Sequence, residues 1–294
     1  ERLSYRLRTP EESDYAEISV CCSGGARMTV VPIIKRDYIT KLAEQGKRID
    51  GRNFDQYRNF EIETKVVNKA EGSARVKIGN TQVLVGIKID LGEPFADSPN
   101  MGVLSTAAEL IPLASPDFES GPPREDAIEL ARVVDRGVRE SQVVDVEKLV
   151  ITPGEKVWII FIDIHILDYD GNLFDAASLG ALAALSTTTI PAKRFSEQLP
   201  EEYPKEDFPL PMSEPPISCT AVKINDFVLF DPCFDEEIIA DARLTVATDP
   251  KGDIRAMQKG LSGSFTRDEI QKVIKGALDN GQEIRKKLYQ SIGK

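Results

Sequence analysis

The stretch that most constrains the fold is an apolar run followed directly by a helix of small residues. Residues 157–167 (Val-Trp-Ile-Ile-Phe-Ile-Asp-Ile-His-Ile-Leu) are rich in β-branched side chains, which is typical of a central strand. After a polar turn at 168–172, residues 173–188 are so rich in alanine and leucine that a helix here is apolar on every side. Such a helix must be covered, so the sequence predicts a strand and a buried helix at the centre of the protein.

Shorter patterns on both sides of this unit predict strands followed by helices, twice over. Strands are predicted at 60–67, 73–78, 81–89, 103–113, 217–224, 227–229, 243–248 and 254–258. Helices are predicted at 34–45, 126–141 and from Thr266 onward, where Thr266 and Glu269 form a capping box. This order predicts an α+β architecture in two similar halves.

Changes in composition divide the chain into five segments. Residues 1–27 match nothing that follows, and we expect a non-native or disordered extension there. Residues 28–59 hold the first helix and a polar Arg48–Arg52 turn, and 60–190 form the first domain. Residues 191–216 are rich in proline and charge, which predicts a linker, and 217–294 form the second domain.

The composition excludes several classes of protein. The net charge of −11 rules out global electrostatic attraction to nucleic acid, so any such contact must be local or shared with a more basic partner. No apolar run approaches the roughly 20 residues of a membrane helix. The cysteines are Cys21, Cys22, Cys219 and Cys233, and the one histidine is His165, which argues against a zinc site and fits a reduced cytoplasmic protein.

The helix predicted over 126–141 carries two different stripes. The apolar stripe consists of Ala127, Ala131, Val134 and Val138. The cationic stripe consists of Arg132, Arg136 and Arg139. Two interpretations are open: the arginines form a ridge that binds an anion, or Glu129, Asp135 and Glu140 pair with them on an ordinary solvated face.

Four stretches together resemble one family. They are Arg-Ile-Asp-Gly-Arg at 48–52, residues 70–85, Leu-Ala-Ser-Pro at 113–116, and Glu-Leu-Ala-Arg-Val-Val-Asp-Arg at 129–136. From about residue 34 to 290 the chain resembles the RNase PH family, and within it the non-catalytic ring subunit of the archaeal exosome. The resemblance implies a two-layer RNase PH-like α+β fold with a duplicated β-α core.

The same resemblance implies an assembly. The partner is a catalytic RNase PH-like subunit, and the two alternate in a ring of three heterodimers that also carries RNA-binding cap subunits. Single-stranded RNA threads the ring and is shortened from its 3′ end by phosphate. No membrane is involved.

Two departures from the family pattern predict that this chain is not the catalytic subunit. Active members carry a phosphate-binding motif of the Gly-Thr-Arg type at the turn that matches Asp168–Leu173. In this chain the turn has two aspartates and no arginine. Active members also place a carboxylate just before the strand matching 244–247, where this chain has Arg243, with Asp241 two residues earlier. We therefore expect no catalytic residue, metal ligand or bound cofactor in this chain. The resemblance implies that phosphate and Mg²⁺ are used in the active site of the partner.

With this context, Arg132 and Arg136 become the first candidates for binding RNA, because guanidinium groups match phosphate geometry without reading bases. Arg139 is a third candidate with Asp135 as its alternative partner, and Arg124 lies just before the helix.

The remaining candidates are expected to be structural. His165 and Trp158 are expected in the core. A solvated loop is expected for Asp231, Asp235, Glu236 and Glu237.

Three functions remain open from the sequence. The chain is a non-catalytic RNA-binding subunit, a phosphorolytic exoribonuclease active in its own right, or a purely structural assembly module.

Overall fold

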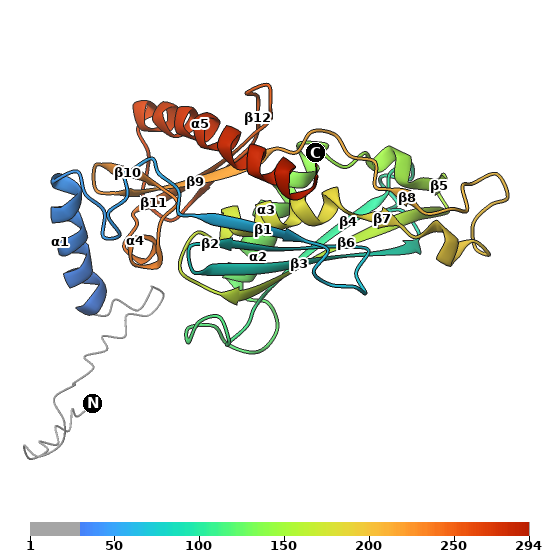
Figure 1. Cartoon of the computed structure of the whole chain (residues 1–294), viewed down its shortest axis with the longest axis horizontal. Coiled ribbons are helices and arrows are strands. Elements are labelled where there is room, and N and C mark those ends of the chain that lie inside the picture. Colours follow the sequence, from blue (N-terminus) through green and yellow to red (C-terminus); the bar gives the residue numbers. More distant parts are fainter. Residues whose placement is uncertain (1–29, 294) are drawn as a thin grey trace, which may run out of the picture.

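The computed structural model describes residues 30–293, with side chains from Lys35 onward (Figure 1). The predicted extension over 1–27 lies outside the described residues. The first half of the chain builds a six-stranded sheet from β1 (Phe60–Thr64), β2 (Gly72–Ile78), β3 (Thr81–Gly92), β4 (Val103–Leu110), β5 (Val150–Thr152) and β6 (Lys156–Asp168). The order is β1-β2-β3-β6-β4, and β5 also pairs with β6.

Strand β6 is central, as the apolar run predicts, with β3 antiparallel on one side and β4 parallel on the other. Every second side chain of β6 is buried: Trp158, Ile160, Ile162, Ile164 and Ile166. Helix α3 (Leu173–Ser186) packs against β2 and β3 and is buried from Leu173 to Leu185. The strand predicted to reach residue 113 ends at Leu110, because Pro112 has no N–H to donate.

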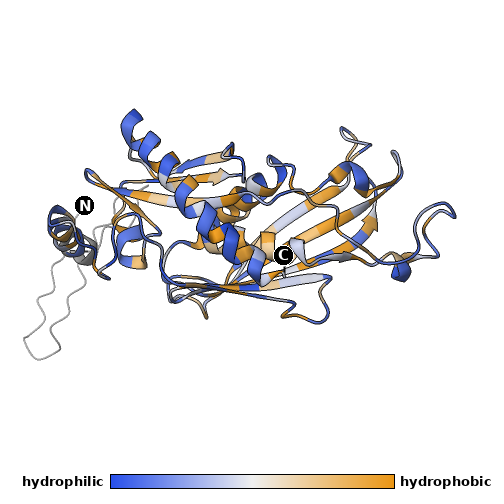
Figure 2. Ribbon diagram, turned by 45° about the horizontal axis from the view of Figure 1, so that its top comes forward, coloured by the Kyte–Doolittle hydropathy of each residue, from blue (hydrophilic) through white to orange (hydrophobic). Residues whose placement is uncertain are grey.

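The second half builds a four-stranded antiparallel sheet from β9 (Ile217–Ile224), β10 (Phe227–Phe230), β11 (Ala242–Thr248) and β12 (Ile254–Gly260), in the order β10-β9-β11-β12. The last helix, α5 (Arg267–Ser291), covers β9 and β11 with a buried stripe that includes Val273, Ala277 and Ile284. Helix α3 also contacts β9, so it lies between the two sheets. In Figure 2 the hydrophobic residues follow the strands and α3, while α5 turns a hydrophilic face outward.

The N-terminal helix α1 (Val30–Glu44) joins the second sheet and not the first. Ile39 is buried with Val222, Ile224 and Leu229, next to the short helix α4 (Phe234–Ile238). Residues 191–216 contain the 3-10 helix η2 (Ala192–Phe195) and strand β8 (Phe208–Pro209), which pairs with β7 (Thr189–Ile190). Helix α2 (Glu125–Arg139) and the 3-10 helix η1 (Val146–Leu149) complete the elements.

Within residues 30–293, no helix combines the length and the apolar character needed to cross a membrane.

Replacing Thr266 by alanine is expected to lower the free energy of unfolding by about 1 kcal/mol, because the side chain caps α5. Thr266 Oγ1 accepts from Glu269 N at 3.3 Å, and Glu269 Oε2 accepts from Thr266 N at 2.7 Å. Urea denaturation measures the change. Thr266→Ser, which keeps the hydroxyl, is the control, and an equal loss in both variants would contradict the capping role.

Candidate nucleic-acid interface

Helix α2 separates an apolar face from a charged one. Its buried side chains are Ala127, Leu130, Val133, Val134 and Val138, and they pack against β4 and α3. Acidic residues in the first turn and arginines in the last turn match the helix dipole. The predicted apolar stripe is therefore confirmed except at Ala131, which is only half-buried beside the more deeply buried Leu130.

Arg132 and Arg136 lie one turn apart on the exposed face of α2. Arg136 Nη1 donates to Gln258 Oε1 on β12 at 2.7 Å. No carboxylate among the described residues lies within 4.0 Å of either guanidinium. A groove of about 430 Å³ lies between α2 and β12, and it is lined by Glu125, Ile128, Glu129, Arg132, Val133, Arg136 and Gln258. Of its two carboxylates, Glu129 accepts from Arg243. The charges of Arg132 and Arg136 are thus available to an external anion.

The other two candidates are already engaged by carboxylates. Arg139 donates through Nε to Asp135 Oδ2 at 2.9 Å and through Nη2 to Leu104 O at 3.1 Å. The hydrogen bond to Asp135 raises the pKa of Arg139. Arg124 forms an ion pair with Glu119. Among the described residues, the structure therefore brings Arg132 and Arg136 together without carboxylate partners and gives Arg139 the alternative partner expected from the sequence.

The turn that precedes α3 is held by a carboxylate of this chain. Asn172 has the left-handed φ of 57°, and its N–H donates to Glu237 Oε2 at 2.8 Å. The Tyr169 hydroxyl also donates to Glu237 Oε2, at 3.3 Å. Burial raises the pKa of Glu237, partly offset by the Asn172 N–H. A helix N-terminus attracts anions, and here the chain itself supplies one.

Gly171 allows the 168–172 turn to pack closely against the backbone of residues 232–234. Its φ is +85°, and a Cβ there would lie 2.5 Å from Pro232 O. Only glycine therefore lets the 168–172 turn pack against the start of α4.

Arg243 of β11 lines a cavity of about 180 Å³ together with Tyr169, Phe174 and Glu237. Its Nη2 donates to Glu129 Oε1 at 2.6 Å, its Nη1 lies 3.9 Å from Glu237 Oε1, and its guanidinium stacks 3.9 Å over the Phe174 ring. Asp241, two residues earlier, instead accepts from Arg36 Nη2 at 2.6 Å and Asn225 N at 2.8 Å. No cluster of potential metal ligands is found in the described part of the chain.

The solvated loop predicted for the acidic residues 231–237 is wrong. Asp231 and Glu236 are each 0% exposed. Glu236 is paired with Arg48, which is also buried and donates to the carbonyl oxygens of Phe230 and Asp231. We name this group, completed by Arg52 and Arg58, the arginine hub.

Asp231 is the centre of the arginine hub. It accepts from Arg58 Nη2 at 2.8 Å, Arg52 Nη1 at 2.9 Å and Asn172 Nδ2 at 2.7 Å. Burial alone would raise the pKa of Asp231, but the hydrogen bonds and the charge of Arg58 outweigh it and hold the pKa below its usual value. Sequence reasoning missed this hub. The available signal was three arginines at 48, 52 and 58 in a segment with few apolar residues.

Of the two residues expected in the core, Trp158 is buried and His165 is not. Trp158 is fully buried and donates to the Tyr203 hydroxyl at 3.0 Å, as expected for a core residue. His165 is half-exposed, with Nδ1 3.2 Å from Glu109 Oε2. It lies on the opposite face of β6 because its position alternates with those of the buried isoleucines.

Sequence relatives cover nearly the whole chain. A curated exosome complex component Rrp42 of Thermococcus kodakarensis is 53% identical over 270 residues, which span 92% of this chain and 99% of the relative. The protein of the same name from Methanocella arvoryzae is 56% identical over 259 residues, or 88% and 97% of the two chains.

Solved structures agree with this. The Archaeoglobus fulgidus exosome with RNA bound to the active site contains a chain that is 47% identical, with a TM-score of 0.83, over 88% of this chain and 99% of that one. A chain of an archaeal exosome core is 44% identical with a TM-score of 0.79, over 88% and 98%. The models of the 3′ exoribonuclease family match residues 56–191 as domain 1 and 214–280 as domain 2. With its RNase PH-like fold, this chain belongs to the RNase PH family of 3′ exoribonucleases.

Proposed function

We propose that this chain is a non-catalytic ring subunit of an archaeal exosome, which binds RNA and completes the active site of a catalytic partner for phosphate-dependent 3′-to-5′ degradation. Its relatives at 53% and 56% identity are named exosome complex component Rrp42. The related chain at 47% identity belongs to an exosome with RNA bound.

The RNA-binding role rests on Arg132 and Arg136. Both guanidinium groups are exposed on one face of α2, and Arg136 has only an amide partner. Because the net charge of the chain is −11, any RNA contact that this chain itself makes needs a local cationic site. Two free arginines one helical turn apart provide such a site, and they contact phosphates without selecting a sequence.

The non-catalytic role rests on one observation: Glu237 Oε2 accepts the Asn172 N–H at the start of α3. A phosphate ion that approached this helix would meet a carboxylate at the position where it needs a donor. Two guanidinium groups of the described residues lie near this turn, and both are engaged within the chain. Arg243 is held by Glu129 and Phe174, and Arg58 by Asp231 and the carbonyl oxygens of Asp170 and Gly171. These contacts support the proposal that phosphate is not bound at this turn.

The partners follow from this assignment. A catalytic RNase PH-like subunit alternates with this chain in a ring of three heterodimers, RNA-binding cap subunits sit on the ring, and single-stranded RNA is the substrate. The partner's active site supplies the phosphate and Mg²⁺ sites. We place the complex in the cytoplasm.

A phosphate-dependent RNA decay assay tests the proposal. The isolated chain is expected to release no nucleoside diphosphate from single-stranded RNA, and co-purified chain and partner are expected to release it only when phosphate is present. Release by the isolated chain would show an exoribonuclease active in its own right. Activity of the partner alone, unchanged when this chain joins it, would reduce this chain to a structural module.

A further inference from the structure

Strand β4 leaves one edge of the six-stranded sheet open. Within residues 30–293 its one partner strand is β6, to which it pairs in parallel and without a register shift. The N–H of Gly102 donates away from β6 to Val146 O, and Leu104 O accepts from Arg139. Backbone groups of even-numbered residues therefore point to the open edge, because direction alternates along a strand. Among the described residues, those of Thr106 and Ala108 have no hydrogen-bond partner.

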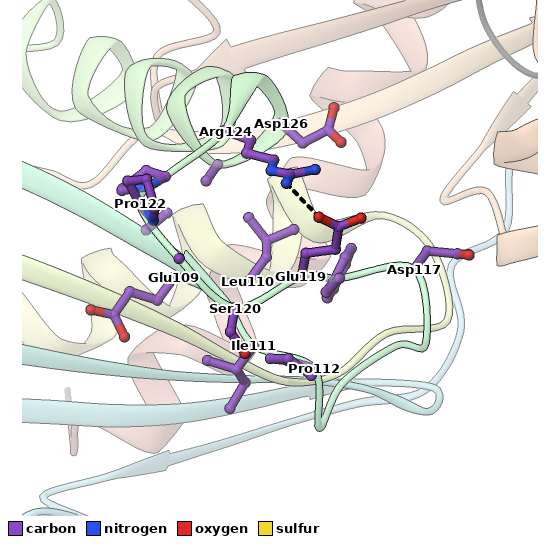
Figure 3. Close-up of a pocket in the computed structure, with 15 residues that line it drawn as sticks. Glu109, Leu110, Ile111, Pro112, Asp117, Glu119, Ser120, Pro122, Arg124 and Asp126 are labelled. Carbon is purple, nitrogen blue, oxygen red and sulfur yellow. Dashed lines mark ion pairs between the residues drawn. The ribbon is translucent and has the colours of Figure 1, made fainter.

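A continuous trough follows this open edge. One cavity of about 370 Å³ lies between Thr106–Ala108 and the α2 residues Ile128 and Ala131. A second cavity, of about 390 Å³, continues past Glu109 and Leu110 under the loop that leads to α2 (Figure 3). The two cavities share Ala108, Pro123 and Ala127. Five residues of β4 line the trough, and an extended segment of the same length spans roughly 16 Å.

The open edge lacks the features that keep the other sheet edges described below from pairing with another strand. Strand β1 carries the exposed Glu61 and Glu63, and β10 is short and donates from Phe230 N to Phe54 O. Strand β12 follows a register shift in its pairing with β11 and carries Arg255 and Lys259. Strand β4 reads Val-Leu-Ser-Thr-Ala-Ala-Glu-Leu, with Glu109 near its end as the one charge and without lysine, proline or a bulge. A regular edge strand without such features readily pairs with a strand of another chain, and β4 has this character.

The lining of the trough selects the kind of occupant. Alanines at 107, 108, 127 and 131 let another backbone come close. At the near end, Arg132 and Asp135 line the trough. At the far end it is lined by the carboxylates of Glu109, Asp117, Glu119 and Asp126 and by one cation, Arg124, which pairs with Glu119. These carboxylates repel the phosphates of RNA and favour an extended peptide with small side chains and a basic residue at that end.

We propose that the trough receives an extended segment of the catalytic ring partner, which adds to the six-stranded sheet as a further strand. The inference rests on the proposed function, because it takes the partner subunit as the occupant. It gives the heterodimer a shared sheet in which Thr106 and Ala108 form main-chain hydrogen bonds to the partner.

Residue-resolved amide hydrogen exchange tests this strand addition. The amides of Thr106 and Ala108 are expected to exchange fast in the isolated chain and at least about 100-fold more slowly in the assembled complex. The inward amides of Ser105 and Ala107 are protected in both states and serve as the internal control. If the complex forms in size-exclusion chromatography and the two outward amides remain fast, the inference is overturned while the proposed function stands. If no complex forms, the proposed function itself fails.

A pair of substitutions gives an independent test. Thr106→Pro removes the outward N–H, which proline tolerates on an edge strand, and Thr106→Val loses the same hydroxyl bond to Asp135 but keeps the N–H. The proline variant is expected to bind the partner at least about tenfold more weakly than the valine variant. Equal affinities would contradict the strand addition. If the proline variant does not fold, the exchange experiment decides.

Discussion

Replacing Arg132 and Arg136 together by glutamate is expected to weaken RNA binding by the assembled complex at least about 100-fold at low salt. Each guanidinium contact to a phosphate contributes about 1.5–3 kcal/mol, and the glutamates add repulsion. With alanine at both positions, the salt dependence is expected to fall by about 1.4 in the slope of log affinity against log salt, since each single-strand contact contributes about 0.7. Fluorescence anisotropy with labelled oligoribonucleotides over a salt series measures both quantities.

The matched control changes the same number of charges elsewhere. Lys272 and Lys275 are exposed on α5, and glutamates there are expected to leave RNA binding nearly unchanged. If the α2 variant assembles with the partner and still binds and degrades RNA like the wild type, the arginines do not contact RNA. The cationic face of α2 then serves assembly alone.

Replacing Asp231 by asparagine is expected to lower the free energy of unfolding by about 3–5 kcal/mol, because it leaves nearly buried arginines without their counter-charge. The carboxylate accepts from Arg52, Arg58 and Asn172 and is 0% exposed. Chemical denaturation at neutral pH measures the loss. Asp235→Asn, at a half-exposed position of α4 where the carboxylate pairs with Lys35, is expected to cost less than about 1 kcal/mol.

The same residue predicts the direction of a pH effect. The pKa of Asp231 is held below its usual value in the folded protein, mainly by Arg58 against the opposing effect of burial. Its stabilising contribution is therefore present above about pH 4, the pKa of an unfolded aspartate, and is lost as the pH falls further. The stability difference between wild type and Asp231→Asn should narrow on acidification. A difference that widens below pH 4 would contradict the ion-pair assignment.

The fold could be predicted from the sequence where local pattern and burial agree. The β6 run and the alanine-rich α3 are apolar beyond what any exposed element tolerates, and the capping box at Thr266 marks the start of α5 by local chemistry alone. His165 was misplaced because an apolar run hides which residues face the core. Strand alternation assigned it to the other face.

The candidate site was predictable only in part, because charge partners distant in sequence leave no local signal. The spacing of Arg132 and Arg136 predicts a shared face, which the structure shows. The roles of Asp231 and Glu237 depend on contacts that span 173 and 65 residues of sequence. From its sequence alone, the acidic segment 231–237 resembles a solvated loop. Only the tertiary fold places the arginines and the start of α3 around it.

The arginine hub has a consequence for how the polypeptide matures on the ribosome. Arg48 and Glu236 are 188 residues apart, so at about 5–20 residues per second the arginine emerges roughly 10–40 s before its counter-ion. During that interval α1 and the Arg48–Arg58 segment lack the sheet on which they dock. The N-terminal part of the nascent chain therefore stays open to chaperones or anionic ligands until translation is nearly complete.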